Sequence, residues 1–330
     1  MKILYAIQGT GNGHLSRSMD IVPLLKQMGD VDVLVSGNQG DLSVPFPVKY
    51  KFNGLGFIFG KSGGVDLWKT LYKAKLRQFI KEINKLPVED YDLVINDFEP
   101  VSAWACYLKN KFCIGLSHQA AVVSDKSPKP DDVDMMGKFI LNHYAPTNVQ
   151  YGFHFAEFDK NISTPVIRKQ VRQQAITNAG HYTVYLPAYD DSRLIKRLSA
   201  FKNITWDVFS KHNKKVLHYK NVHIQPINNE NFIKSMASAA GVLCGAGFET
   251  PAEALFMNKK LLCIPMKNQY EQHLNAAGLK YLGVPLMKSL KEKHHEILSN
   301  WLENGTPVKV DYPDRTKELL EMIVKKHGGN

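Results

Sequence analysis

Short apolar runs alternate with amphipathic stretches along the chain, and this order constrains the fold more than any other feature of the sequence. Apolar runs at 2–8, 31–35, 92–96 and 112–116 are typical of buried strands, and residues 15–28 show helical spacing. A strand buried on both faces is a short continuous apolar run, and a helix that links two such strands makes them parallel. The alternation therefore predicts an α/β protein with a parallel sheet covered by helices.

The same pattern starts again in the second half of the chain. Further apolar runs predict strands at 182–186, 216–219, 222–225, 241–244 and 261–264, with a helix at 190–200. The length of 330 residues suits about two domains. We therefore expect two Rossmann-like domains, 1–160 and 175–312, joined by a linker over 161–174. Residues 313–330 would form a C-terminal helix that packs back on the first domain.

Composition narrows the classes of partner and compartment. Forty-two basic and 31 acidic residues give a net charge of +11, which favours anionic partners. We expect no nucleic-acid partner, because no basic and aromatic motif for one is present. No apolar run approaches the ~20 residues that span a bilayer, and the run at 3–7 is too short for a signal peptide. The four cysteines form no C-x-x-C pair, so we expect reduced thiols in a cytoplasmic protein and no bound metal.

A glycine-rich loop follows the first predicted strand but does not fit a dinucleotide site. The fingerprint of such a site is G-x-G-x-x-G, and its third glycine would fall at position 14 or 16, where His14 and Ser16 stand. The second strand also ends at Ser36-Gly37, without the acidic residue that binds a ribose. We therefore expect no NAD, FAD or other cofactor.

Polar residues follow three predicted strands, at the edge where doubly wound sheets bind ligands. They are Gly11-Asn12-Gly13-His14, Asp97 and Ser117-His118-Gln119. A carboxylate beside a histidine fixes the tautomer of the ring and stabilises its charge after proton uptake. We hypothesise that His14 is a general base oriented by Asp97, with Gly11, Asn12, Gly13 and His118 on the acceptor side. The alternative is that His14 and Asp97 each cap a helix.

The strand at 241–244 leads into a second candidate site. The turn Gly245-Ala246-Gly247-Phe248 precedes a predicted helix that contains Thr250 and Glu253. A helix start offers unpaired N–H groups and a positive dipole end, so it would bind a diphosphate without a metal. Glu253 could accept hydrogen bonds from ribose hydroxyls. Alternatively, Thr250-x-x-Glu253 is a capping box with Pro251 at the first helical position.

A further polar pair opens the helix after the strand at 261–264. Glu271 and Gln272 could bind the hydroxyls of a sugar, because a carboxylate accepts hydrogen bonds while an amide both donates and accepts them.

Two motifs together resemble the signatures of GT-B glycosyltransferases of families 1 and 28. Family 1 includes the UDP-glycosyltransferases, and family 28 includes the peptidoglycan glucosaminyltransferase. One is the donor-binding order Gly247…Glu253…Pro265…Glu271-Gln272-x-x-Asn275-Ala276. The other is the N-terminal loop Gly11-Asn12-Gly13-His14-Leu15-Ser16-Arg17. The close match covers about residues 1–20 and 240–285. Plant-type members have a phosphate-binding histidine where this chain has Gly245.

The resemblance implies a GT-B fold, with two parallel sheets facing a cleft. It also implies inverting, metal-independent transfer of a hexose from a nucleotide-sugar, UDP-linked in most of these enzymes, to a hydroxyl acceptor. On the matching positions, His14 would be the base and Asp97 its partner. Gly245, Ala246, Gly247, Phe248 and Thr250 would bind the diphosphate, Glu253 the ribose, and Glu271 and Gln272 the hexose.

Residues 65–86 predict a basic amphipathic helix, with six basic and two acidic residues for a local charge of +4. Such a helix could dock on an anionic membrane surface and bring the site to a lipid-linked acceptor at the inner face of the cell membrane. The alternative is an ordinary packed helix with a solvated basic face. Two other functions also stay open: a nucleotide-sugar epimerase, and a non-catalytic protein that binds sugar nucleotides.

Overall fold

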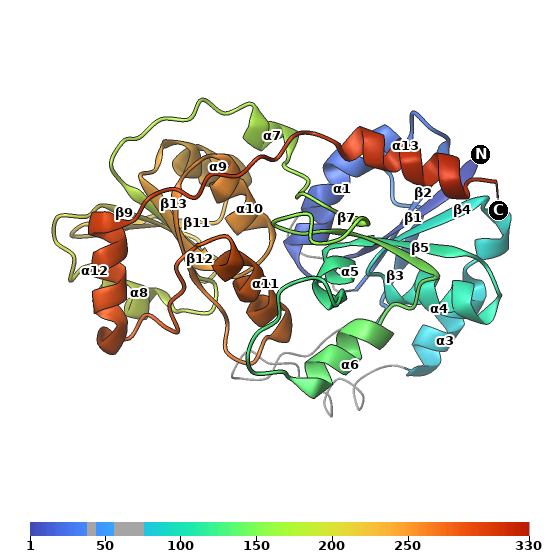
Figure 1. The fold of residues 1–330 in the computed structure, drawn as a ribbon, viewed down its shortest axis with the longest axis horizontal. Coiled ribbons are helices and arrows are strands. Elements are labelled where there is room, and N and C mark those ends of the chain that lie inside the picture. Colours follow the sequence, from blue (N-terminus) through green and yellow to red (C-terminus); the bar gives the residue numbers. More distant parts are fainter. Residues whose placement is uncertain (38–43, 56–75, 330) are drawn as a thin grey trace. The chain divides into compact units, whose positions relative to one another are not determined.

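The computed structural model describes residues 1–37, 44–55 and 76–329, and the chain forms two compact units (Figure 1). The first unit contains Met1–Ser127, Asp131–Arg168 and Pro313–Asn330. The second unit contains Pro128–Pro130 and Lys169–Tyr312.

The first unit is built on a parallel sheet with the strand order β3-β2-β1-β4-β5-β6-β7. These strands are β1 (Lys2–Gln8), β2 (Asp30–Ser36), β3 (Tyr50–Phe52), β4 (Leu93–Asp97), β5 (Cys113–Ser117), β6 (Val149–Phe153) and β7 (Ile162–Ser163). From β1 the chain adds strands on one side, and then returns to add β4 on the other. The direction of winding therefore reverses between β1 and β4, where open α/β sheets bind ligands.

Helices surround this sheet. The described ones are α1 (Asn12–Leu25), α3 (Leu76–Lys85), α4 (Pro100–Leu108), α5 (His118–Val123), α6 (Met135–His143) and α13 (Thr316–His327), with a 3₁₀ turn at Val88–Asp90. The C-terminal helix α13 packs on α1 (Figure 1). Its His327 is buried and forms a 2.9 Å hydrogen bond with the hydroxyl of Tyr151, which anchors the end of the chain to β6.

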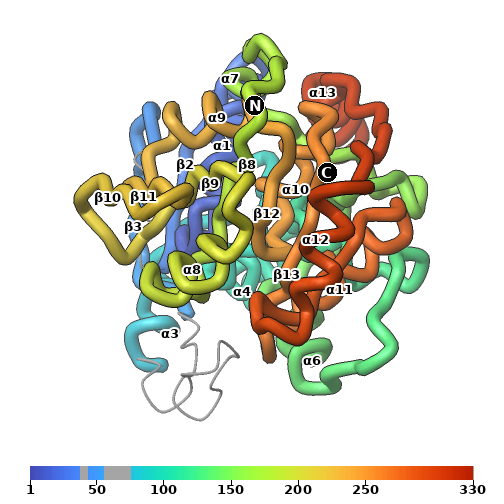
Figure 2. The backbone as a smooth tube through the Cα atoms, turned by 90° about the vertical axis from the view of Figure 1, so that its left-hand side faces the viewer, coloured from blue at the N-terminus to red at the C-terminus, as the bar shows by residue number. Residues whose placement is uncertain are grey.

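The second unit repeats the winding scheme with the strand order β10-β11-β9-β8-β12-β13, which Figure 2 shows from one edge of the sheet to the other. The strands are β8 (Tyr182–Tyr185), β9 (Trp206–Ser210), β10 (Leu217–Tyr219), β11 (Val222–Pro226), β12 (Gly241–Gly245) and β13 (Lys260–Ile264). All pair in parallel except the edge strand β10, which runs antiparallel to β11. The reversal here falls between β8 and β12.

The helices of the second unit complete the repeat. They are α7 (Lys169–Arg172), α8 (Asp191–Leu198), α9 (Asn229–Ser238), α10 (Glu249–Phe256), α11 (Tyr270–Tyr281) and α12 (His295–Asn304), with a 3₁₀ turn at Glu292–His294. A cluster of buried apolar side chains from the strands, α8 and α12 forms the core, centred on the fully buried Trp206.

The predicted strands lie within about one residue of those observed, but the sequence did not reveal β3, β6, β7 or β9. Strand β6 was missed because glycine interrupts its apolar pattern. A Cβ on Gly152 would lie 2.6 Å from the Cβ of Ala121, so glycine is required for α5 to pack on this strand. Strand β7 occupies part of the predicted linker and pairs with β6, so the chain leaves the first unit at Arg168.

Candidate active site

His14 and Asp97 lie together at the reversal point of the first sheet. Asp97 is the last residue of β4 and pairs in register with Ile7 of β1, while His14 lies in the first turn of α1, which follows β1. The Nδ1 atom of His14 lies 2.8 Å from Oδ1 of Asp97. A carboxylate only accepts hydrogen bonds, so this contact assigns the proton of the neutral ring to Nδ1 and leaves the lone pair on Nε2.

A third residue, Arg17, completes this cluster. Its Nη2 donates to both carboxylate oxygens of Asp97, at 2.9 and 3.0 Å, and its Nε donates to Oδ2 at 3.3 Å. Complete burial raises the pKa of Asp97, but the positive charge of Arg17 and the hydrogen bonds from His14 and Arg17 outweigh this effect and lower that pKa below its ordinary value. Asp97 is therefore ionised at neutral pH.

The alternative that His14 and Asp97 cap helices is wrong. The N-cap of α1 is Gly11, whose φ of 96° lies in the region that glycine adopts without strain. The N-cap of α4 is Glu99, whose carboxylate accepts hydrogen bonds from the N–H groups of Val101 and Ser102 at 2.7 and 2.6 Å. Asp97 is thus free of any capping task.

The predicted acceptor-side residues lie at the starts of two helices, α1 and α5, and differ in exposure. Gly11 and Asn12 are exposed beside His14, and Gly13 is partly exposed in the first turn of α1. His118, the first residue of α5, is instead 2% exposed, and its Nδ1 lies 2.7 Å from the carbonyl oxygen of Phe153. Its position is therefore in the core of the unit.

The next residue, Gln119, contacts His14 instead. Its Nε2 lies 3.4 Å from Nε2 of His14, the ring atom that faces away from Asp97. Successive residues of a helix point about 100° apart, so the exact start of α5 decides which of the two side chains faces His14. The sequence placed this polar segment correctly but could not select between neighbours.

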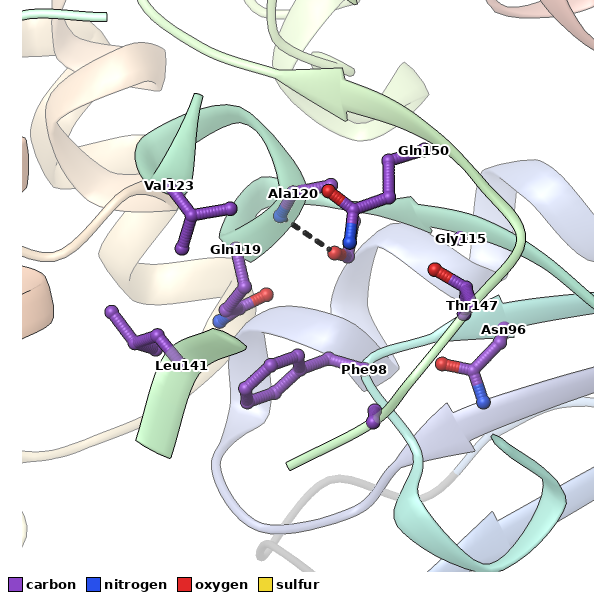
Figure 3. Close-up of a pocket in the computed structure, with 11 residues that line it drawn as sticks. Asn96, Phe98, Gly115, Gln119, Ala120, Val123, Leu141, Thr147 and Gln150 are labelled. Carbon is purple, nitrogen blue, oxygen red and sulfur yellow. Dashed lines mark hydrogen bonds between the residues drawn. The ribbon is translucent and has the colours of Figure 1, made fainter. Parts of the chain in front are cut away.

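Gln119 also lines a small pocket in the first unit (Figure 3). The lining includes the ring of Phe98, Val123 and Leu141 on one side and Thr147 and Gln150 on the other. The Phe98 ring lies parallel to that of His14, with 6.5 Å between centroids. The described residues that line the pocket carry no ionisable side chain. The small pocket thus lies close to His14, and its described lining is uncharged.

In the second unit, the loop Gly245–Phe248 leads from β12 into α10. Phe248 is the N-cap, with no capping bond from its side chain, and Glu249 is the first helical residue. The helix begins earlier than expected, so Thr250 and Pro251 are its second and third residues. The capping box with Pro251 at the first position is therefore wrong. A Cβ built on Gly247 would meet no atom within 4 Å, so this part of the loop borders open space.

The first turn of α11 lies beside that loop. The Nδ2 of buried Asn275 donates to the carbonyl of Ala246 at 3.1 Å, which ties the helix to the loop. The Oε1 of Gln272 accepts from the N–H of Met266 at 2.9 Å, and Glu271 is partly exposed in the same turn. Glu253 of α10 is 3% exposed.

The four cysteines are free thiols in the core. All are buried, as expected for reduced residues. Burial raises the pKa of Cys263, whose Sγ lies 3.9 Å from that of Cys244, so the thiol is unreactive at neutral pH. Within the described ranges, no group of three or more histidine, cysteine or acidic residues is arranged to hold a metal ion.

Residues 1–304 match the sequence model described as glycosyl transferase family 1. This chain belongs to that family. The expected membership among the GT-B glycosyltransferases is confirmed, and the protein is a glycosyltransferase. No curated protein sequence matches the chain significantly.

Several solved glycosyltransferase structures have the same fold as this chain, at low sequence identity. The spinosyn forosaminyltransferase SpnP is 13% identical, with a TM-score of 0.57 over 99% of this chain and 95% of that one. MurG of Acinetobacter baumannii is 13% identical, with a TM-score of 0.58 over 98% and 99%. UGT89C1 of Arabidopsis thaliana, solved in complex with quercetin, is 13% identical, with a TM-score of 0.58 over 99% and 94%. These likenesses establish the GT-B fold.

Proposed function

We propose that this glycosyltransferase transfers a hexose from a UDP-sugar to a hydroxyl acceptor, with inversion at the anomeric carbon and without a metal ion. The observation that carries the proposal is the 2.8 Å contact between His14 Nδ1 and Asp97 Oδ1 at the reversal point of the first sheet. A histidine whose outer nitrogen holds a lone pair, backed by an ionised carboxylate, is equipped to remove a proton from a hydroxyl group.

In the proposed reaction, the acceptor oxygen forms a bond to the anomeric carbon while the bond from that carbon to the diphosphate breaks. The hydroxyl proton passes to Nε2 of His14, and the electron pair of the broken bond leaves with UDP. Asp97 stabilises the imidazolium that forms. Attack on the face opposite the leaving group inverts the configuration of the anomeric carbon.

The second unit would hold the donor. Gly245 to Phe248 and Thr250 surround the start of α10, where backbone N–H groups and the helix dipole favour a diphosphate. A leaving diphosphate gains negative charge as the bond breaks, so donors already fixed at this helix start would stabilise the transition state more than the ground state. We assign Glu253 to the ribose, and Glu271 and Gln272 to the hexose. UDP is favoured because UGT89C1, a fold relative, has been solved with UDP-L-rhamnose.

The acceptor would lie over the small pocket beside Gln119, with one hydroxyl against Nε2 of His14. Phe98 and Leu141 offer an apolar surface, and Thr147 and Gln150 offer uncharged hydrogen-bonding groups. An uncharged hydroxylated acceptor, such as a glycoside or a phenol, fits this lining.

A lipid-linked acceptor at an anionic membrane is the finer form of this proposal. Residues 65–75 of the predicted basic helix lie outside the described residues. The described part, α3, buries Phe79 and Ile83 but leaves Leu76 and Ile80 each 51% exposed, next to exposed Arg77 and Lys81. Apolar and basic side chains on one face are typical of helices that bind anionic lipid. Among the described helices, none is long and apolar enough to cross a membrane.

The membrane part can be tested by sedimentation with vesicles. We expect the protein to bind phosphatidylglycerol vesicles at low salt. The double substitution of Leu76 and Ile80 by serine should weaken binding about tenfold or more, because each side chain is 51% exposed and would gain about half of the ~1.5–3 kcal/mol that full burial provides. Exposed Ile297 of α12, changed to serine, is the matched control. Binding that is equal for neutral and anionic vesicles, or equal for all variants, would contradict the membrane role.

The central experiment is a thermal-shift screen with UDP, GDP and dTDP and their glucose derivatives, followed by product analysis with glycoside and phenol acceptors. We expect UDP to raise the melting temperature of the wild type and of His14→Ala equally, while His14→Ala loses transfer by a factor of about 10³ or more. Transfer that persists in His14→Ala rejects the base assignment. UDP binding without any product would favour a non-catalytic binding protein, and interconversion of two UDP-sugars without acceptor would favour an epimerase.

A further inference from the structure

Arg17 is buried, which is unusual for a long cationic side chain. It is 2% exposed, whereas arginine is rarely buried unless a partner neutralises its charge. That partner is Asp97, which is fully buried and receives three of the donated hydrogen bonds of Arg17. The Nη2 atom of Arg17 also lies 3.2 Å from Nδ1 of His14. Arg17 therefore contacts both members of the pair on which the proposed base depends.

The charges around Asp97 give Arg17 a definite electrostatic effect. Among the described residues, the charged and titratable groups that contact this carboxylate are Arg17 and His14 on α1 and the Tyr5 hydroxyl on β1, which donates to Oδ2 at 3.4 Å. With a neutral His14, the cluster of Arg17 and Asp97 has no net charge. Without Arg17, the buried negative charge of Asp97 would be available to hold a proton on His14.

We propose that Arg17 is a positioning residue of the catalytic base, in two respects. Its guanidinium fork fixes the Asp97 carboxylate so that Oδ1 faces Nδ1 of His14. Its positive charge, 3.2 Å from Nδ1, opposes protonation of the ring and so favours a free lone pair on Nε2 for the acceptor proton. The catalytic consequence rests on the proposed function, but the effect on the protonation of His14 does not.

A purely structural role is the competing explanation. Arg17 also lies over the ring of Phe153, with 5.5 Å from Cζ to the ring centroid, so it could serve only to fill and tie the core. A structural ion pair would affect folding, but replacing it would not move the protonation of His14 in a protein that still folds. The two explanations therefore differ in a quantity that can be measured without any substrate.

The test is the pH titration of the histidine ring signals of the full-length protein by NMR, with His14 assigned from its loss in His14→Gln. We expect the titration midpoint of His14 to rise by about one pH unit or more in Arg17→Met, because a cation within 4–6 Å is removed. The direction holds whether the extra proton resides on His14 or Asp97, since the pair binds one more proton in either case. A midpoint equal to that of the wild type in folded Arg17→Met overturns the proposal.

Two further variants keep the test decisive if Arg17→Met does not fold. Arg17→Lys retains the charge but not the planar fork, so we expect an unmoved midpoint and a kcat that is lower by roughly ten- to a hundredfold at constant KM, as misplacement of a catalytic group predicts. Wild-type kcat in Arg17→Lys overturns the positioning role. Ser18→Ala is the matched control and should move neither quantity, because the buried Ser18 hydroxyl donates to the carbonyl of Leu15 on the same helix, at 2.6 Å, and to no other group in the described part of the chain.

These readouts separate the inference from the proposed function. If no sugar transfer is found but the His14 midpoint rises in Arg17→Met, the proposed reaction is wrong and the electrostatic role of Arg17 stands. If transfer is found but neither the midpoint nor kcat responds to the Arg17 variants, the reaction stands and Arg17 is structural.

Discussion

The two units wind their sheets in the same order but build different chemistry at the same topological place. At the reversal point between β1 and β4, the first unit buries an arginine and a carboxylate beside a histidine. At the reversal point between β8 and β12, the second unit has a glycine-containing loop and a helix start without a side-chain cap. The first edge thus presents charged side chains, and the second presents the backbone N–H groups of a helix start. The winding fixes where a ligand binds, and the residues after each strand decide what is done to it.

The substitution Asp97→Asn should have the largest effect and tests whether activity depends on the charged residues of the first unit. Asparagine keeps the shape but removes the charge that orients His14 and neutralises Arg17, so we expect transfer to fall by a factor of about 10³–10⁴. We also expect the free energy of unfolding in urea to fall by about 3–5 kcal/mol, because a buried cation loses its partner. Donor binding by the second unit should be unchanged in calorimetry.

Exposed Asp92, at the other end of the same region of sheet, provides the control. Asp92→Asn removes a carboxylate that accepts a hydrogen bond from the N–H of Lys2, without any contact to His14. It should leave transfer unchanged. Equal losses in Asp92→Asn and Asp97→Asn would mean that the activity does not depend on the first unit's charged edge.

Acidification should lower the stability of the protein through the Asp97 carboxylate of the first unit. The pKa of Asp97 is lowered from its ordinary value of 3.8 in the folded protein, so folding is favoured by its ionised form. Its contribution to stability is fully present above about pH 4 and is lost as the pH falls through the lowered value. The urea midpoint of the wild type should therefore fall more steeply below pH 4 than that of Asp97→Asn. Parallel pH curves for the two proteins would contradict an ionised Asp97.

The smallest expected effect concerns the glycine-containing loop of the second unit. An added methyl in Gly247→Ala meets no protein atom, so stability should hold, but it would occupy the space proposed for the diphosphate. We expect the affinity for UDP to fall about tenfold, or 1.4 kcal/mol, in calorimetry. In contrast, Gly180→Ala forces alanine to a φ of 85° and should cost about 1 kcal/mol of stability with UDP affinity unchanged. Unaltered UDP binding in Gly247→Ala would remove the diphosphate from this loop.

The sequence allowed the fold and the pairing of His14 with Asp97 to be predicted for one physical reason. Buried parallel strands are continuous apolar runs, and their carboxyl ends meet at one edge, so residues 83 positions apart could be placed together. Arg17 was quoted only as part of a loop motif, because nothing in a helical pattern tells a solvated arginine from a buried one. The sequence also did not show which residue of α5 faces His14, so His118 was predicted to lie there, whereas Gln119 makes the contact.

The capping motif in the second unit failed for a related reason. Thr250 and Glu253 have the spacing of a capping box, but that spacing also occurs inside a first turn. The helix extends back to Glu249, and the choice between the two depends on the loop that enters it. The local motif therefore located the start of α10 approximately but did not define which residue caps the helix.

The return of α13 to the first unit has a practical consequence for dissecting the enzyme. Apart from Pro128–Pro130, the second unit is one uninterrupted stretch, inserted into a first unit that holds both chain ends. Those ends lie close together, since a Cβ on Gly328 would approach the Sδ of Met1 to 2.8 Å. Joining the ends by a short spacer and opening the chain at Lys169 would give a circular permutant in which each unit is nearly contiguous in sequence. The two halves could then be exchanged with those of other glycosyltransferases by a single crossover.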